Sequence, residues 1–229
     1  MNTQKETAPA EPGLKNNVQS PDAEPAENEY TIYGDRLPRM QAALDEVLEA
    51  VSEYRKIRKA VHGDDPVEHC LSRIKTDASM REKCRRRGLP FTQETALTEI
   101  KDAIGIRVVC QFLKEIYGIR DYLADVSGYA VVREKDYIKA AKKNGYRSYH
   151  MTLLADGFFV EVQLRTISMD TWAALEHQMR YKNRSGRAED SLIISELKRC
   201  ADELASTDIS MQTIRDMIFE EGAFSKPSG

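Results

Sequence analysis

The spacing of apolar residues predicts that regular structure begins near Pro38. From there apolar side chains recur three and four positions apart, which is the period of one face of an α-helix, at Leu44, Val47, Leu48 and Val51. Tyr54 and Arg58 continue the same pattern. We therefore predict a first helix that begins near Pro38 and extends to about Arg58.

Short β-branched and apolar runs alternate with further helical patterns along the rest of the chain. They predict strands over residues 67–75, 104–112, 129–133, 149–154 and 158–165, and helices over 79–87, 114–126, 166–181, 190–204 and 208–220. Asp156-Gly157 predicts a hairpin, because Asp-Gly favours the primed turns that match strand twist. Ser79, with Glu82 at capping-box spacing, and Thr166 are the predicted N-terminal caps of two helices. The pattern indicates an α+β fold, a mixed sheet of about five strands flanked by helices.

Residues 1–33 hold few large apolar side chains. Four of the eight prolines lie there, at positions 9, 12, 21 and 25, and so polar a segment cannot offset the entropy lost on ordering. We expect a disordered tail over 1–33, a folded domain over 34–188 and C-terminal helices over 189–229.

Composition narrows the class of protein. With 229 residues, 41% of them hydrophobic, the chain suits one domain with appendages. A formal net charge of −3 gives no overall attraction to nucleic acid or membrane. The four cysteines form no C-x-x-C pair, so neither a zinc site nor a disulfide framework is indicated. Because no apolar run approaches the roughly 20 residues of a membrane helix and no signal-peptide pattern occurs, we expect a cytoplasmic protein.

Residues 73–87 form a basic segment. They hold seven Lys and Arg against two acidic residues. Arg73 and Lys75 share one face of the predicted strand, and Lys83 shares a helix face with Arg87. Cations that converge from two elements near a helix N-terminus suit a polyphosphate, although a solvated basic helix would show the same sequence.

Two carboxylates belong to strands that are otherwise apolar. Asp102 lies at the start of one strand, which also carries Arg107. On another strand, Glu161, Gln163 and Arg165 alternate along one face. Charged groups in such strands need partners or a cavity. Either an ion-paired, exposed sheet face or the floor of a site meets that need.

Residues 136–150 interleave cations and aromatic rings around the turn signal Asn144-Gly145. The side chains are those of Tyr137, Lys142, Lys143, Tyr146, Arg147, Tyr149 and His150. This arrangement suits a nucleotide, whose phosphates bind the cations and whose base stacks on a ring. A plain basic hairpin loop is the alternative.

Together the clusters indicate a site for a nucleoside polyphosphate and magnesium. Asp102 and Glu161 could hold one Mg²⁺, which prefers hard oxygen ligands, including substrate phosphates. The chain has no G-x-x-x-x-G-K-[ST] loop, protein-kinase signature or G-x-G-x-x-G, so the common phosphate-binding motifs are excluded. The residues by themselves do not identify the reaction.

The order of four motifs resembles the synthetase domain of the RelA/SpoT family. The motifs are RIKTDASMREK, DAIGIRVVCQF, EKDYIKAAKKNGYRSYH and EVQLRTISMDTWAALEH, and the resemblance covers roughly residues 38–215. It implies a nucleotidyltransferase-like mixed sheet and transfer of the β,γ-pyrophosphate of ATP to the 3′-hydroxyl of GDP or GTP, giving (p)ppGpp and AMP in the stringent response. The short chain is similar to the small alarmone synthetases. Because the sequence contains no His-Asp dipeptide, we expect no hydrolase domain and a synthetase-only enzyme.

The resemblance also implies a role for each matching residue. Arg73 and Arg107 would sandwich the adenine, and the ATP phosphates would bind Lys75, Ser79, Lys83 and Arg86. The acceptor would bind Tyr146, stacked on the guanine, with Lys142, Lys143, Arg147, His150 and Gln163. Asp102 and Glu161 would bind Mg²⁺, and Glu161 would also activate the 3′-hydroxyl.

Two departures from the family pattern leave parts of this assignment open. Ala141-Lys142 replaces the usual Pro-Lys, which leaves the preference between GDP and GTP undecided. Residues 69–72 lack the Phe-x-x-Gly of an allosteric alarmone site, so we do not expect allosteric activation.

The resemblance extends to partners. It implies a homo-oligomer, a tetramer by preference, built by the C-terminal helices; single-stranded RNA is a further candidate partner, whereas DNA and membranes are not expected. Two other functions fit the residues: a family toxin that pyrophosphorylates an adenine nucleotide or the 3′ end of tRNA, and a non-catalytic RNA-binding regulator.

Overall fold

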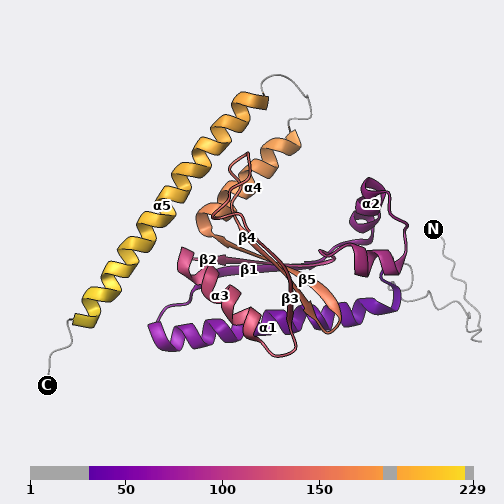
Figure 1. Cartoon of the computed structure of the whole chain (residues 1–229), viewed down its shortest axis with the longest axis horizontal. Helices are drawn as coiled ribbons and strands as arrows, with labels where there is room; N and C mark the ends of the chain where they lie inside the picture. Colours follow the sequence, from indigo (N-terminus) through magenta and orange to yellow (C-terminus); the bar gives the residue numbers. More distant parts are fainter. Residues whose placement is uncertain (1–30, 183–189, 225–229) are drawn as a thin grey trace, which may run out of the picture.

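The computed structural model describes residues 31–182 and 190–224. Along the chain the elements are η2 (Gly34–Arg36), α1 (Leu37–His62), β1 (Val67–Ile74), α2 (Asp77–Arg87), η3 (Thr95–Glu99), β2 (Ile104–Cys110), α3 (Leu113–Asp125), β3 (Ala130–Asp136), β4 (Tyr149–Ala155), β5 (Phe158–Thr166), α4 (Ile167–Lys182) and α5 (Asp190–Phe224) (Figure 1). The five strands form one sheet in the order β1-β2-β5-β4-β3. Among these strands only β2 and β5 pair in parallel. The predicted mixed sheet flanked by helices is confirmed.

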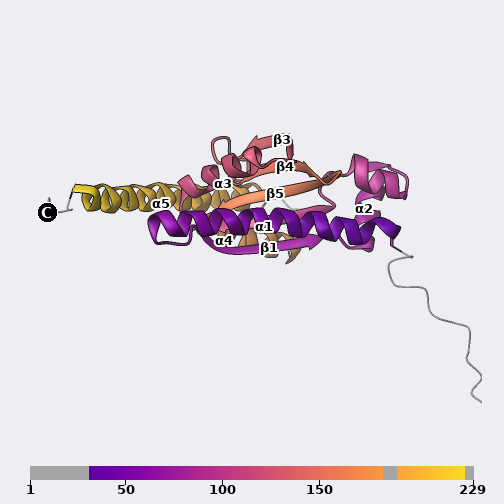
Figure 2. The ribbon, with the colours of Figure 1, turned by 90° about the horizontal axis from the view of Figure 1, so that it is seen from below.

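One face of the sheet is the apolar core. Ile104, Ile106 and Val108 alternate along β2 and are buried, as strand periodicity requires. The long helix α1 lies along this face with α3 beside it (Figure 2). Because α1 and α3 cover this face, the side chains that alternate with the core residues point to the other face, where polar groups gather.

The hairpin and two helix caps follow from local sequence. Asp156 and Gly157 have φ values of 44° and 79°, as the predicted primed turn demands. Thr166 caps α4 by accepting a hydrogen bond from the Met169 amide at 3.2 Å. The predicted start of α2 is wrong by two residues. Thr76 is the cap, because its side chain accepts from the Ser79 amide.

The C-terminal part is one continuous helix, not the two that we predicted. Residues Ser206-Thr207-Asp208 read as a new helix start, but the helical hydrogen bonds continue through them. Thr207 and Ser210 donate their hydroxyl hydrogens to carbonyl oxygens four residues back. Asp208 accepts instead from Thr166 Oγ1 at 2.6 Å. Asp208, which resembles a helix cap in the sequence, therefore joins α5 to the start of α4.

The predicted tail extends three residues too far. Residues 1–30 lie outside the described ranges, but Ile32 and Tyr33 are buried at 5% and 2% exposure. The Tyr33 hydroxyl donates to the Lys75 carbonyl, and the Ile32 amide donates to Asp77. This segment is thus tied to the start of α2. None of the helices in the described residues is long and apolar enough to span a membrane.

Candidate functional site

The polar face of the sheet carries two neighbouring rows of residues that cross all five strands. One row is Leu71, Arg107, Gln163, His150 and Lys135, and the next is Arg73, Gly105, Glu161, Thr152 and Arg133. Paired residues on adjacent strands point to the same face. The register alone therefore gathers groups that lie far apart in sequence into a single floor.

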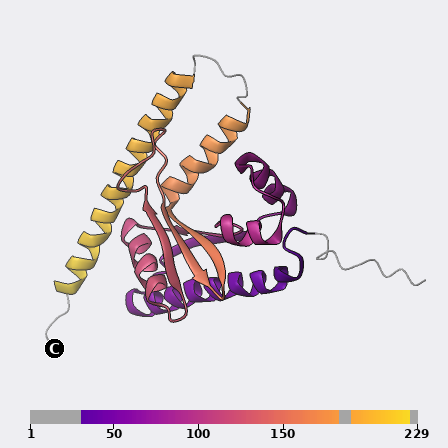
Figure 3. The same ribbon diagram turned by 45° about the vertical axis from the view of Figure 1, so that its right-hand side comes forward.

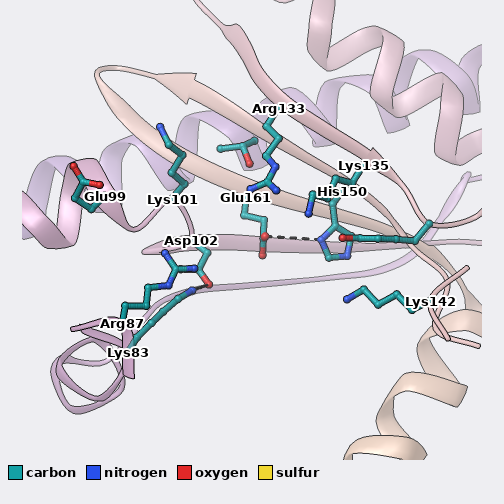
Figure 4. A pocket seen from close by; sticks show the side chains of 12 residues that line it. Lys83, Arg87, Glu99, Lys101, Asp102, Arg133, Lys135, Lys142, His150 and Glu161 are labelled. Carbon is teal, nitrogen blue, oxygen red and sulfur yellow. Dashed lines mark hydrogen bonds and ion pairs between the residues drawn. The ribbon is translucent and has the colours of Figure 1, made fainter. Parts of the chain in front are cut away.

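Two cavities open on this floor and meet at two carboxylates. The larger, of 360 Å³, lies over β3, β4 and β5 and is edged by Lys83 and Arg87 (Figure 4). The smaller, of 230 Å³, lies over β1, β2 and β5 and is lined by Arg73, Lys75 and Arg107, and also by Gln163, which was predicted on the acceptor side. Asp102 and Glu161 line both cavities. Two bound molecules would therefore meet at this pair.

Asp102 fits a divalent cation. Its Oδ2 contacts the Lys83 ammonium and lies 3.6 Å from Lys75 Nζ. Its Oδ1 is buried and has no hydrogen-bond partner among the described residues. A buried carboxylate oxygen without a partner is costly unless a ligand satisfies it. No cluster of three or more His, Cys, Asp or Glu exists in the described ranges, but Mg²⁺ commonly takes one or two carboxylates and completes its shell with water and phosphate.

Glu161 is held in its ionised form. Gln163 Nε2 donates to its Oε2 at 2.8 Å, and His150 Nδ1 lies 3.8 Å from its Oε1. Burial by itself would raise the pKa of this carboxyl, but the interactions with His150, Gln163 and Lys83 lower the pKa to about 2. An ionised Glu161 thus lies beside Asp102 and the surrounding cations where the cavities meet.

The smaller cavity brings together three of the six residues assigned to ATP. They are Arg73, Lys75 and Arg107. Arg107 Nη1 lies 3.4 Å from Asp170 of α4, and burial and the nearby Arg165 both lower the pKa of Arg107. A planar guanidinium at the wall of a cavity is suited to stacking on a base.

Helix α2 presents a different set of residues from the one predicted. Lys83 lines the larger cavity, and so does Arg87, whereas Arg86 is exposed and lines neither of the two. Ser79 also lies outside both linings, and its hydroxyl oxygen accepts from Thr76. The structure does not bring Ser79 and Arg86 to the floor.

The loop between β3 and β4, residues 137–148, was predicted to bind the acceptor and is called the acceptor loop below. It divides into residues that face the larger cavity and residues that brace the loop. Lys142 and His150 line the cavity, and the Lys142 ammonium lies 4.5 Å from the centre of the Tyr146 ring. Tyr146 is set back from the lining, with its hydroxyl 2.8 Å from His150 Nε2. Lys143 is exposed and outside the lining.

Arg147 turns away from the cavity to the long C-terminal helix. Its guanidinium donates to Asp202 at 2.9 Å and to the carbonyls of Gly145 and Ala201. Figure 3 shows α4 and α5 side by side behind this loop. Arg147 therefore anchors the loop, and no sequence pattern distinguished that use from phosphate binding.

Several cavity residues escaped the sequence analysis. They are Lys101, Arg133, Lys135 and Thr152. The predicted strand over 129–133 ended too early, because β3 continues to Asp136. Alternation along the longer strand places Arg133 and Lys135 on the site face, so the signal was present in the Arg-Glu-Lys-Asp run.

Comparison with known proteins identifies relatives over most of the chain. Residues 72–186 match the family model described as "Region found in RelA / SpoT proteins". The GTP pyrophosphokinase YwaC of Bacillus subtilis is 35% identical over 163 residues, which cover 68% of this chain and 74% of that protein. The GTP pyrophosphokinase YjbM of the same organism is 31% identical over 193 residues, 80% of this chain and 89% of that protein.

Solved structures agree with this relationship. The small alarmone synthetase 1 of Bacillus subtilis, bound to its product pppGpp, superposes with a TM-score of 0.69 at 30% identity and covers 80% of this chain and 95% of that one. The small alarmone synthetase 2 of the same organism gives a TM-score of 0.68 at 30% identity, over 80% of this chain and 98% of that one.

Proposed function

Because the chain belongs to the RelA/SpoT family, we propose that it is a GTP pyrophosphokinase that transfers the β,γ-pyrophosphate of ATP to the 3′-hydroxyl of GDP or GTP. The products are AMP and ppGpp or pppGpp. The observation that carries the proposal is the pair of cavities that share Asp102 and Glu161. Such an arrangement suits direct transfer between two nucleotides.

In this proposal ATP occupies the smaller cavity and reaches the carboxylates with its phosphates. Arg73 and Arg107 hold the adenine, while Lys75 and Lys83 neutralise the phosphates beside Asp102. The acceptor occupies the larger cavity, with its base at Tyr146 and its phosphates among the cations of α2, β3 and the loop. Tyr146 lies behind the lining, beside the cavity residues His150 and Lys142. Four predicted ligands outside both linings have less support than Arg87, Arg133 and Lys135; they are Ser79, Arg86, Lys143 and Arg147.

The chemistry requires positioning and charge neutralisation. The acceptor 3′-oxygen attacks the β-phosphorus of ATP, the bond from that phosphorus to the α,β-bridging oxygen breaks, and AMP leaves. Mg²⁺ bound at Asp102 and Glu161 would supply positive charge to the transferred group. Glu161, ionised throughout the neutral range, accepts a hydrogen bond from the 3′-hydroxyl and takes up its proton as the new bond forms.

Replacing either carboxylate tests the proposal. Asp102→Ala and Glu161→Ala should each abolish synthesis, measured by chromatography of nucleotides after incubation with ATP, Mg²⁺ and GDP. Arg39→Ala is the matched control, because Arg39 forms an exposed ion pair with Asp156 on the hairpin. Wild-type rates in either carboxylate variant would contradict the assignment. GTP, GMP, an adenine nucleotide and tRNA offered in turn would identify the acceptor.

We also infer a homo-oligomer, by preference a tetramer, in which α5 supplies the interface. Helix α5 exposes large apolar side chains along its length, including Met211, Ile214, Met217 and Ile218. Contiguous exposed apolar surface of this kind marks an interaction site. We further propose that the enzyme acts in the cytoplasm, where ATP and guanine nucleotides are available, and that single-stranded RNA is a partner bound by the exposed cations of α2.

A further inference from the structure

Arg165, near the end of β5, is a buried cation that neither cavity touches. Its side chain is 6% exposed. Its Nη1 donates to Asp170 Oδ1 at 2.9 Å, and its Nη2 donates to the Tyr146 hydroxyl oxygen at 2.8 Å and to Gln163 Oε1 at 3.2 Å. A buried charge is tolerated when it is paired and hydrogen-bonded in this way. The guanidinium thus joins α4, the acceptor loop and the floor of the site.

The guanidinium fixes the direction of the hydrogen bonds around it, because it can only donate. The Gln163 oxygen accepts from Arg165, so the Gln163 amide nitrogen must face the other way, where it donates to Glu161 Oε2 at 2.8 Å. The oxygen of Tyr146 also accepts from Arg165. Its own hydrogen is then free to be donated to His150 Nε2, 2.8 Å away.

The two sets of hydrogen bonds that start at Arg165, one through Gln163 and one through Tyr146 and His150, both lead to the carboxylate of Glu161. Because the Tyr146 hydroxyl holds the Nε2 side of the ring, His150 presents Nδ1 to Glu161 Oε1, 3.8 Å away. Gln163 reaches the other carboxylate oxygen. One buried arginine therefore sets the orientation of both neighbours of Glu161.

Asp170 connects this arrangement to the smaller cavity. The oxygen that accepts from Arg165, Oδ1, also lies 3.4 Å from Arg107 Nη1. The Asp170 side chain is 16% exposed. A single carboxylate on α4 thus holds an arginine of the ATP cavity and the arginine behind the acceptor cavity.

We propose that Arg165 and Asp170 are a positioning pair: Arg165 orients Tyr146, Gln163 and His150 around Glu161, and Asp170 fixes Arg165 and Arg107 together. The inference rests on the proposed function for the identity of the two nucleotides. Neither residue lines either of the two cavities. Their effect is exerted through the residues that do.

The two residues should give different kinetic patterns. Arg165→Met keeps an unbranched apolar stem and removes the guanidinium donors. It should lower kcat on the order of 10- to 100-fold, the usual cost of losing a partner behind a site residue, and raise the KM of the acceptor by a larger factor than the KM of ATP, whose cavity Gln163 also lines. Asp170→Asn should show the same losses and in addition raise the KM of ATP further, because Arg107 loses its partner.

A third variant, Tyr146→Phe, tests the same hydrogen bonds in case Arg165→Met does not fold. Tyr146→Phe removes only the hydroxyl and keeps the ring, so kcat should fall while the KM of the acceptor changes little. The double variant Arg165→Met/Tyr146→Phe should lose less than the two single losses combined, since both changes break the same route. Arg39→Met, at the exposed pair with Asp156, controls for the loss of an arginine.

The outcomes are decisive. A folded Arg165→Met variant with wild-type kcat and acceptor KM would overturn the role of Arg165, and an unchanged ATP KM in Asp170→Asn would overturn the link to Arg107. If Arg165→Met does not fold, wild-type kcat in Tyr146→Phe overturns the orienting route. Wild-type enzyme that forms no pyrophosphorylated guanosine would instead refute the proposed function. Titration with fluorescent mant-GDP and mant-ATP would then still measure whether Arg165→Met weakens the binding of mant-GDP more than that of mant-ATP.

Discussion

At the scale of the residue, Gly145 illustrates how closely the acceptor loop approaches α5. Its φ is 93°, and a Cβ added there would lie 2.6 Å from the Ala201 Cβ and 3.0 Å from the Lys198 Cα. Both the left-handed backbone and the packing exclude a side chain. The loop that carries Lys142 and Tyr146 is thus set in place by a backbone contact.

Gly145→Ala should therefore be destabilising and should weaken acceptor binding. We expect a loss of about 1–3 kcal/mol in the free energy of unfolding, measured in urea, from backbone strain and the clash, and a higher KM for the acceptor. Gly63→Ala is the matched control, because Gly63 has a similar φ of 82° with nothing within 4 Å of an added Cβ. Equal effects in the two variants would show that contact with α5 is unimportant.

At the scale of the element, α1, α3 and α5 are joined at a buried carboxylate. Glu115 of α3, at 1% exposure, accepts from Tyr54 and Arg58 of α1 and from Arg215 of α5 at distances of 2.8–3.2 Å. Burial would raise the pKa of Glu115, but the hydrogen bond and charge of Arg58, with Tyr54 and Arg215, lower it. Glu115 therefore attaches the C-terminal half of α5 to the core.

Glu115→Gln should destabilise the protein by about 3–5 kcal/mol, because one partner of a buried ionic network is removed. Since the pKa of Glu115 is lower in the folded state, its contribution is present above the pKa of the unfolded carboxyl and is lost as the pH falls through the folded value. Between neutral and acidic pH, the free energy of unfolding measured in urea should therefore fall less in the variant than in the wild type. Glu49→Gln, in an exposed pair with Lys56, should leave the free energy of unfolding nearly unchanged, because water screens such a pair.

The elements also show what the sequence could and could not predict. All five strands followed from β-branched and apolar runs, and Asp156-Gly157 from turn chemistry. The continuity of α5 did not follow, because Ser206-Thr207-Asp208 is a good local cap and only the contact of Asp208 with Thr166 decides otherwise. Arg147 and Arg165 were ambiguous for the same reason. Their partners, Asp202 and Asp170, lie on helices whose placement the local pattern does not define.

At the scale of the whole molecule, α5 extends beyond the sheet (Figure 1). Ile214 and Ile218 lie one turn apart on it and are 49% and 62% exposed. Such side chains are costly to leave in water and gain from burial against another copy.

Ile214→Lys/Ile218→Lys should therefore dissociate the oligomer, measured by light scattering after size-exclusion chromatography. Val61→Lys, a similar change at a site 69% exposed on α1, should leave the mass unchanged. If the wild-type protein is monomeric at the protein concentrations found in the cell, the proposed oligomer is contradicted.

The meeting of the two cavities at Asp102 and Glu161 has a consequence for the order of events in turnover. Neither nucleotide alone brings both the leaving group and the attacking oxygen to that point, so a ternary complex must precede any release of AMP. Reciprocal initial rates plotted against reciprocal ATP concentration, at several fixed acceptor concentrations, should give intersecting lines. Parallel lines, or AMP released from ATP before any acceptor is added, would mean that the pyrophosphoryl group first resides on the protein.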